Sequence, residues 1–458
     1  MNLDLNLRSN TVWAIAEVIA SAVFLFVLYR LVVLRLGVEA LGLWSVVLAT
    51  TSLVRLVDPG AGSGIGRFIA LAHGRGNTQR MSDFFITALL STFVFYGTLG
   101  CAVFGPLWEG LRYAVKEQHL AEARGLLPYA MASFLLMNFN GVVQGALVGV
   151  QRSDLKSKLA IFCLALQLAL ALVLVPSRGL VGVAEAQIAQ YCVAVALGYL
   201  IVLRMMFGRY LVNPSYHWSI SMLSELWQFG IKLQALSIVS FLYEPFSKFA
   251  VSAFGGLELL GLYEMAQKLV LQARQIVVGP TTVLMPAFTK INDLAPVNME
   301  PLYRQSLATI VAFGAMAMAA AAMLSPLIGY FWIGRFDERF IALSCVMSLS
   351  WFVNIVGAPS YLVAIATTKL GWNFWGAFVT SAGSPILAAI AGHALSSQAA
   401  AFGAILALGL GSFLSLVMNC RNFRLPAWPS LADLKHVAEL ITLRLRRTPK
   451  PSCEETAQ

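Results

Sequence analysis

Charged residues are scarce in this chain. Asp, Glu, Lys and Arg make up 12% of its 458 residues, whereas hydrophobic residues make up 59%. An average soluble domain uses about 25% charged residues, so the charges present here are too few to cover the surface of a soluble protein of this length. The shortage excludes an ordinary soluble enzyme and favours a chain that lies within a membrane.

The sequence also lacks the residue spacings that metal sites and hydrolytic active sites require. Its six cysteines and five histidines form no zinc-ligand spacing and no disulfide framework, and we find no nucleophile elbow and no paired catalytic carboxylates. The glycine-rich segment 59–66 has no Gly-Lys-Ser/Thr after it and follows an apolar run rather than a strand. It is therefore not a nucleotide-binding loop, and we interpret it as a flexible break. We expect no enzymatic activity, no metal and no cofactor.

Long apolar runs, in contrast, recur from one end of the chain to the other. A membrane-crossing helix needs about 20 mostly apolar residues, and the first such run is too long for the core of a signal peptide, so we interpret it as a permanent span. The sequence thus predicts an all-α polytopic membrane protein. Its twelve predicted spans are 11–34, 38–57, 83–107, 126–150, 157–176, 180–203, 226–252, 259–288, 303–330, 340–366, 371–393 and 398–420.

The net charge of +10 does not indicate nucleic-acid binding, because the Lys and Arg residues gather in short connections and in the C-terminal tail. Such placement follows the positive-inside rule and predicts that both termini are cytoplasmic. In the tail, apolar residues recur at helical spacing over 431–447. We expect an amphipathic helix there, which either lies on an anionic leaflet or packs against the inner loops of the bundle.

Two segments 219 residues apart repeat one another. Gly37-Val-Glu-Ala-Leu-Gly-Leu-Trp44 aligns with Gly256-Leu-Glu-Leu-Leu-Gly-Leu-Tyr263, with five of eight positions identical. Because six spans separate the two copies, equivalent spans run in the same direction, which predicts a parallel repeat of two six-helix lobes. We therefore divide the chain into an N-lobe (1–209), a linker (210–222), a C-lobe (223–420) and a basic cytoplasmic tail (421–458).

Nine ionisable side chains lie inside or beside predicted spans, where charge is costly and side chains usually face a cavity or one another. They concentrate in spans 1, 2, 7 and 8, which are equivalent in the repeat. The repeat register pairs Arg55 with Arg274, and a one-residue gap pairs Arg30 with Lys248, so each lobe would bring two cations to a central cavity. The nine are Glu17, Arg30, Arg55, Lys232, Glu244, Lys248, Glu264, Lys268 and Arg274.

Further motifs follow in a fixed order. After the first repeat copy come Asp58-Pro-Gly-Ala-Gly62, Arg67-Phe-Ile-Ala70 and Gly149-Val-Gln-Arg-Ser-Asp-Leu155, and the second copy continues into Glu264-Met-Ala-Gln-Lys268. In these motifs and in their order the chain resembles the polysaccharide-transport and O-antigen flippase family of the multidrug/oligosaccharidyl-lipid/polysaccharide exporter (MOP) superfamily. The resemblance covers nearly the whole chain.

This resemblance implies a MATE-like flippase fold, with two six-helix lobes around a central cavity and alternating access. It also implies the movement of a lipid-linked oligosaccharide, usually carried on undecaprenyl pyrophosphate, across a bacterial inner membrane. The partners implied are the lipid-linked oligosaccharide and membrane lipids, with a polysaccharide polymerase and glycosyltransferases as further candidates.

A guanidinium or ammonium group inside such a cavity suits a pyrophosphate. We therefore expect the substrate to contact five cations, and we take three acids as candidates for ion coupling. Other interpretations stay open, because residues near span ends can extend to lipid headgroups and acids and lysines four residues apart can neutralise one another. The five cations are Arg30, Arg55, Lys248, Lys268 and Arg274, and the three acids are Glu17, Glu244 and Glu264.

Two other functions remain possible on the sequence alone. An ion-coupled multidrug antiporter of the same superfamily would carry organic cations and should have an acidic cavity, whereas six of the nine ionisable residues above are cations. A membrane scaffold of a polysaccharide-synthesis complex would transport nothing and would use the basic tail for docking.

Overall fold

The computed structural model describes residues 3–54, 61–207, 218–294, 299–435 and 439. All regular secondary structure in this described part is helical. Its elements are α1 (Leu3–Leu36), α2 (Val38–Ser52), α3 (Ala61–Gly74), α4 (Thr78–Ala114), α5 (Glu117–Gly149), α6 (Ser153–Arg178), α7 (Leu180–Phe207), α8 (Ile220–Gly255), α9 (Leu257–Val278), the 3-10 helix η2 (Gly279–Val283), α10 (Leu284–Leu294), α11 (Met299–Ile333), α12 (Glu338–Ala366), α13 (Gly371–Ala394) and α14 (Ala399–Phe423).

Eleven of the twelve predicted spans each overlap a single helix. The eighth, 259–288, instead covers most of α9, all of η2 and the start of α10, because Pro280 at the start of η2 has no N–H group to continue the α-helix. Within the described residues, nine helices are long and apolar enough to cross a membrane by length and composition. The three remaining predicted spans correspond to α2, which is a shorter apolar helix, and to α8 and α9, which carry the clustered charges. The all-α membrane fold with twelve spans is therefore confirmed.

Several boundaries differ from the prediction because the helices continue past the apolar core of each span. Residues 108–125, predicted as an outer loop, are the end of α4 and the start of α5, separated only by Val115 and Lys116. The predicted flexible break at 59–66 is helical from Ala61 onward. Glycine serves close packing here, since a Cβ atom on Gly149 of α5 would lie 2.8 Å from the carbonyl oxygen of Gly66.

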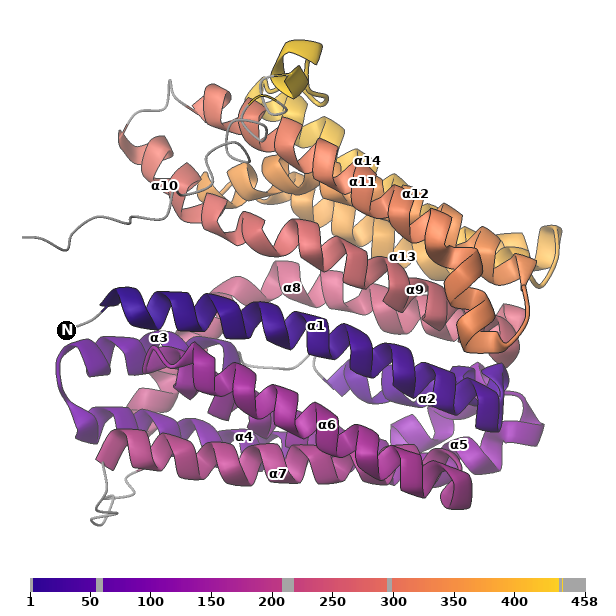
Figure 1. Ribbon diagram of the computed structural model, residues 1–458, viewed down its shortest axis with the longest axis horizontal. Helices are drawn as coiled ribbons and strands as arrows, with labels where there is room; N and C mark the ends of the chain where they lie inside the picture. The colour runs from indigo at the N-terminus through magenta and orange to yellow at the C-terminus, as the bar shows by residue number, and fades with distance from the viewer. Residues whose placement is uncertain (1–2, 55–60, 208–217, 295–298, 436–438, 440–458) are drawn as a thin grey trace, which may run out of the picture.

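The elements occur twice in the same order. In both series a long helix (α1, α8) is followed by a shorter one (α2, α9), a short helix (α3, α10) and four long helices (α4–α7, α11–α14). The two long first helices have 34 and 36 residues. Figure 1 shows the first series in the lower half of the molecule and most of the second in the upper half, with α1 and α8 along the boundary and α3 and α10 at the same end. The parallel repeat of two lobes is thus confirmed.

The repeated motif begins at the same backbone kink in both lobes. Gly37 and Gly256 have φ angles of +89° and +85°, a region that glycine adopts at little cost. Their N–H groups donate to the equivalent carbonyl oxygens of Val33 (3.0 Å) and Ser252 (2.9 Å). Since α1 and α8 run unbroken up to these glycines, the register needs no gap.

The ungapped register corrects one pairing proposed from the sequence. With a constant offset of 219, Tyr29 is the repeat partner of Lys248, and Arg30 is not. A one-residue gap would match the two cations, but an insertion inside a regular helix would rotate every earlier side chain by about 100°. The two members of the corrected pair differ in charge.

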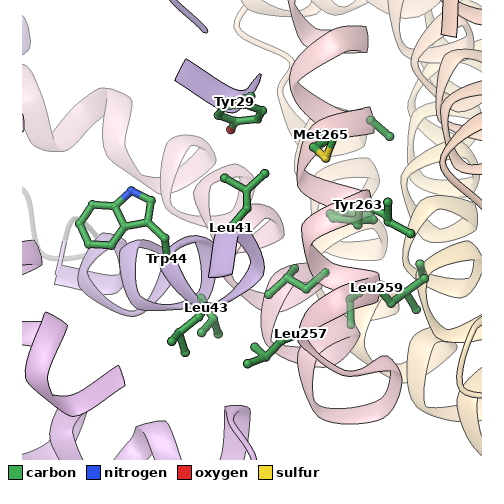
Figure 2. Packing of buried hydrophobic residues seen from close by; sticks show 14 of the residues in the cluster. Tyr29, Leu41, Leu43, Trp44, Leu257, Leu259, Tyr263 and Met265 are labelled. Atoms are coloured by element: carbon green, nitrogen blue, oxygen red, sulfur yellow. The ribbon is translucent and has the colours of Figure 1, made fainter. Parts of the chain in front are cut away.

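The two copies of the motif pack directly against one another at the interface between the lobes. A Cβ atom on Gly42 would lie 2.0 Å from the carbonyl oxygen of Leu257, and a Cβ atom on Gly261 would lie 2.2 Å from that of Val38. These contacts are reciprocal, because each glycine approaches the second residue of the other copy. Figure 2 shows Leu43 of α2 beside Leu257 of α9 at this contact. The axis that relates the lobes therefore passes between α2 and α9.

Adding a methyl group at this contact should push the lobes apart. We expect Gly261→Ala to lower the free energy of unfolding by about 1–3 kcal/mol, the usual cost of overpacking, because the clash is with backbone atoms that cannot rotate away. Thermal unfolding of the purified protein measures the change. Gly97→Ala in α4 is the matched control, since nothing lies within 4 Å of its added Cβ; destabilisation equal to that of the control would contradict the close contact.

Two predicted regions are described only in part. Of the linker 210–222, the structure describes residues from Trp218 onward, whose indole Nε1 donates to Ser91 Oγ of α4 at 3.1 Å. The first turns of α8 therefore pack on the N-lobe, where Leu226 joins a buried cluster of α3, α4 and α5 residues. In the tail, Ser430 and Asp433 form the reciprocal hydrogen bonds of a helix start, and most of the predicted helix 431–447 lies outside the described residues.

Candidate functional site

Among the described residues, a polar cavity lies in each lobe, and these two cavities lie between equivalent helices. The N-lobe cavity is lined by α1, α2, α5, α6 and α7, with α8 and α9 contributing from the C-lobe, and has a volume of ≈ 370 Å³. The C-lobe cavity is lined by α8, α9, η2, α12, α13 and α14 and has a volume of ≈ 390 Å³. The two cavities therefore occupy equivalent positions in the repeat but are lined by different side chains.

The N-lobe cavity has a wall of neutral polar groups and a wall of charges. The charged wall comes from the C-lobe helices α8 and α9, which bring two lysines and two glutamates to the boundary between the lobes. The neutral polar residues that line this cavity include Tyr29, Ser45, Thr51, Ser52, Ser133, Gln167, Gln187, Gln190 and Tyr191.

The four charges form one connected cluster. Lys248 Nζ lies 2.7 Å from Glu244 Oε1 and 2.8 Å from Glu264 Oε2, and Lys268 Nζ lies 3.5 Å from Glu264 Oε1. Both predicted pairs four residues apart are thus present, and Lys248 joins them. Lys248 and Glu264 are buried, with about one twentieth of each side chain exposed. Since two cations meet two carboxylates, the formal charge of this cluster is zero.

Glu264 also joins the two lobes. Its carboxylate accepts hydrogen bonds from Ser45 Oγ of α2 at 2.8 Å and from Tyr29 Oη of α1 at 3.2 Å. Ser45 is the repeat partner of Glu264, and Tyr29 is the repeat partner of Lys248, so equivalent positions of the two lobes meet at the axis. Removing one partner of such a buried ion pair leaves the other charge uncompensated and is strongly destabilising.

Among the described residues that line the C-lobe cavity, one side chain is charged. Arg274 of α9 donates from Nε to Asn354 Oδ1 at 3.1 Å, and its guanidinium carbon lies 4.9 Å from the ring centroid of Trp351. No Asp or Glu is among the residues described as lining this cavity. The other lining groups are mainly hydroxyls, amides and aromatic rings: Ser240, Tyr243, Thr281, Tyr361, Asn373, Thr380, Ser381, Ser412 and Ser415.

Asn354 fixes the orientation of this arginine. Its Nδ2 donates to Ser412 Oγ of α14 at 3.1 Å, so its Oδ1 faces Arg274. With Nε engaged and one face of the guanidinium on Trp351, the terminal Nη1 and Nη2 groups have no hydrogen-bond partner within the part of the chain that the structure describes. The side chain is therefore pre-oriented, with its two outer donors available to a ligand in the cavity.

Of three other residues predicted for the site, two lie away from both cavities, and the third is not among the described residues. Arg30 Nη1 donates to the carbonyl oxygen of Phe331 in α11, its guanidinium lies over the ring of the same residue, and it lines neither cavity. Glu17 of α1 accepts from Lys156 Nζ at 2.9 Å and from Ser157 Oγ at 2.7 Å, so it is paired with a cation of α6. Arg55 lies outside the described residues.

Sequence reasoning missed most of the polar residues that surround Arg274. Asn354, Tyr361 and Asn373 are single polar residues in apolar runs, and no spacing distinguishes them from residues that satisfy their own helix. Tyr29 and Ser45 could have been found, because the ungapped repeat register aligns them with Lys248 and Glu264. Trp351 is only 9% exposed and packs inside the C-lobe.

Comparison with solved structures identifies the fold. The chain is similar to an inward-facing multidrug resistance transporter of the MATE family in the MOP superfamily (TM-score 0.68, 14% identity, 88% of this chain and 94% of that one). It is equally similar to the lipid II flippase MurJ in an inward closed conformation (TM-score 0.68, 14% identity, 95% and 94%). A MOP superfamily transporter from Pyrococcus furiosus also matches (TM-score 0.61, 14% identity, 91% and 95%).

At these identities the similarity shows the fold alone. A search of the curated proteins gave no match. Residues 7–292 match the model of the family described as "Polysaccharide biosynthesis protein", and this region covers more than half of the chain. The chain therefore belongs to the polysaccharide biosynthesis protein family and has the fold of the MOP superfamily.

Proposed function

We propose that the protein is a flippase that moves an undecaprenyl-pyrophosphate-linked oligosaccharide from the cytoplasmic to the periplasmic leaflet of a bacterial inner membrane. Membership of a polysaccharide biosynthesis family and the MOP fold support a membrane transporter with a sugar-bearing cargo. The observation that carries the anionic part of the proposal is Arg274, the one charged residue among those described in the lining of the C-lobe cavity.

The chemistry of Arg274 suits a pyrophosphate. An arginine presents two parallel N–H donors that match two phosphate oxygens, and such charge-assisted pairs are about twice as strong as neutral hydrogen bonds. Asn354 and Trp351 hold the guanidinium in place, so little side-chain entropy is lost on binding. A substrate anion at this point would meet no competing carboxylate among the described lining residues, in contrast to the N-lobe cavity with Glu244 and Glu264.

The remaining lining of the C-lobe cavity suits a sugar. Hydroxyl and amide side chains pair with sugar hydroxyls, and aromatic rings such as Tyr243 and Tyr361 offer apolar faces to the carbon side of a pyranose. The polar oligosaccharide would occupy the chamber while the lipid chain stays in the bilayer.

Rotation of the lobes about the α2–α9 contact would alternate access to the cavities. Lys248 and Lys268 would act mainly through the charge cluster at the lobe boundary, while Arg30 would contact the substrate only in another conformation. Arg55 stays a proposed substrate contact. Glu17, Glu244 and Glu264 remain candidates for ion coupling. Both termini would be cytoplasmic, and a polysaccharide polymerase and glycosyltransferases would be the functional partners.

Reconstitution in liposomes tests this function. We expect the purified protein to speed the transbilayer movement of a fluorescent undecaprenyl-pyrophosphate-linked oligosaccharide, because a charged headgroup crosses lipid only through a polar path. The same oligosaccharide on neutral diacylglycerol should move no faster than in protein-free liposomes, since it lacks the anion that Arg274 binds.

Each alternative function gives a different outcome in these liposomes. A multidrug antiporter would transport organic cations and leave the glycolipid in place. A membrane scaffold would accelerate neither movement. Equal acceleration of the charged and neutral glycolipids would contradict the assignment of an anion site.

A further inference from the structure

A third hollow opens on the outer side of the C-lobe. It is a groove of ≈ 760 Å³ between the end of α9, η2 and α10 on one side and α11 on the other. The exposed apolar residues at its mouth include Ile276 (67% exposed), Phe313 (40%) and Met316 (62%). In a membrane these side chains face lipid, so the groove is open to the hydrocarbon core.

The hydroxyl groups of the groove offer few free hydrogen-bond donors to a ligand inside it. Ser306 Oγ donates to the carbonyl oxygen of Leu302 at 2.7 Å, and Thr309 Oγ1 donates to that of Gln305 at 2.8 Å. Both hydroxyl hydrogens are therefore already engaged one turn back along α11. The surface that remains for a ligand is mainly carbon, which suits a hydrocarbon chain and not a sugar or a phosphate.

The groove and the C-lobe cavity share a wall. Thr281 of η2 lines both of them, while Val277 lines the groove and Val278 lines the cavity. This wall is the 3-10 segment Gly279–Val283, a tighter helix type that often marks a hinge. Arg274 lies on the last turns of α9 just before it. The 3-10 helix η2 thus separates the polar C-lobe cavity from the lipid-facing groove.

We propose that this groove holds the isoprenoid chain of the substrate while its pyrophosphate binds Arg274 in the C-lobe cavity. The inference rests on the proposed flippase function and deepens it. A substrate with a polar head and an apolar chain must pass through the cavity wall at one place, and η2 is the wall that both hollows share. On the predicted orientation the α10–α11 connection is cytoplasmic, so the groove opens toward the leaflet from which the substrate is loaded.

The groove gives the isoprenoid chain a path out of the cavity and adds little to its binding free energy. A chain that moves from the bilayer into the groove exchanges one apolar surrounding for another, and association in lipid gains little from the hydrophobic effect. Filling the groove with protein atoms should therefore act by steric exclusion, since the head cannot reach Arg274 if the chain has no exit. A ligand with the same head and almost no chain would not need the groove.

The test fills the groove and compares two probes that share a pyrophosphate. Ala317→Trp combined with Ala320→Trp places two indoles among the groove residues, and Ala319→Trp is the matched control on an exposed position of α11 outside the groove. Equilibrium binding of labelled undecaprenyl pyrophosphate and of labelled dimethylallyl pyrophosphate is measured in nanodiscs. We expect the groove variant to bind undecaprenyl pyrophosphate about tenfold more weakly and to bind dimethylallyl pyrophosphate like the wild type.

The other outcomes separate failure of the inference from failure of the proposed function. If the groove variant binds both probes like the wild type, the groove holds ordinary bilayer lipid and the inference fails while the flippase function stands. Equal loss of both probes also contradicts a chain-specific groove. If the wild-type protein binds neither pyrophosphate, both the groove assignment and the proposed function are wrong.

Discussion

Cells that depend on this protein for surface polysaccharide are expected to lose its export when Arg274 is replaced by alanine, while the protein stays at normal abundance in the membrane. The substitution removes the one cation among the described lining residues of the C-lobe cavity. Truncating one partner of a desolvated charge pair costs about 2–5 kcal/mol, which corresponds to at least about a thirtyfold loss of substrate affinity.

Abundance should be preserved because Arg274 contributes little to folding. Within the described residues it makes one hydrogen bond, to Asn354, and lies over the ring of Trp351, and alanine leaves no buried charge behind. Arg274→Lys should retain part of the export, since it keeps the charge and loses the two-pronged geometry. Arg304→Ala, which breaks an exposed pair with Glu300, is the matched control and should export normally. Normal export by Arg274→Ala would refute the anion site.

Replacement of Glu264 by glutamine is expected to destabilise the protein itself. The carboxylate of Glu264 binds Lys248 at 2.8 Å and accepts from Ser45 and Tyr29 of the other lobe. Removing one partner of a buried ion pair costs about 3–5 kcal/mol. Because Glu244 still neutralises part of the charge on Lys248, we expect a loss near the lower end, about 3 kcal/mol, seen as a lower midpoint of thermal unfolding.

Two further variants test whether the destabilisation comes from the buried, unpaired charge on Lys248 or simply from the loss of an acidic residue. Glu258→Gln removes a half-exposed carboxylate on the same helix, whose pair with Arg339 should be worth about 1 kcal/mol or less. Adding Lys248→Met to Glu264→Gln should restore part of the lost stability, because the unpaired buried ammonium is then gone. If the midpoint of thermal unfolding of Glu264→Gln is no lower than that of Glu258→Gln, the cluster does not hold the lobes together.

The fold was largely predictable because hydrophobic run length alone identifies membrane helices. Eleven of the twelve predicted spans each overlap a single helix, and the eighth runs past the end of α9 into η2 and α10. The repeat of Gly37–Trp44 in Gly256–Tyr263 correctly indicated two parallel lobes. The helix ends were less predictable, since polar residues there lie near the headgroups and carry no hydropathy signal. Glycine is common both in flexible turns and where two helices pack closely. The sequence alone therefore does not distinguish these two roles for the glycine-rich segment.

The site was predictable for its charges and not for its geometry. A charged side chain in an apolar run is conspicuous, so Lys248, Lys268 and Arg274 stood out from the sequence. Nothing in the sequence indicated that the lysines line one chamber and the arginine another, because a helix presents opposite faces to different neighbours at positions only a few residues apart. Asn354, which orients Arg274, lies 80 residues away, and only the tertiary fold brings the two together.

The central claim is that the pyrophosphate binds in the C-lobe cavity, at the arginine that no described carboxylate neutralises. Equilibrium binding of undecaprenyl pyrophosphate to purified protein in nanodiscs tests it most directly, with Arg274→Ala compared with Lys268→Ala. The account predicts that Arg274→Ala weakens binding by at least about thirtyfold and that Lys268→Ala changes it little. The reverse result, with affinity kept by Arg274→Ala and lost by Lys268→Ala, would place the pyrophosphate in the N-lobe cavity and contradict the account.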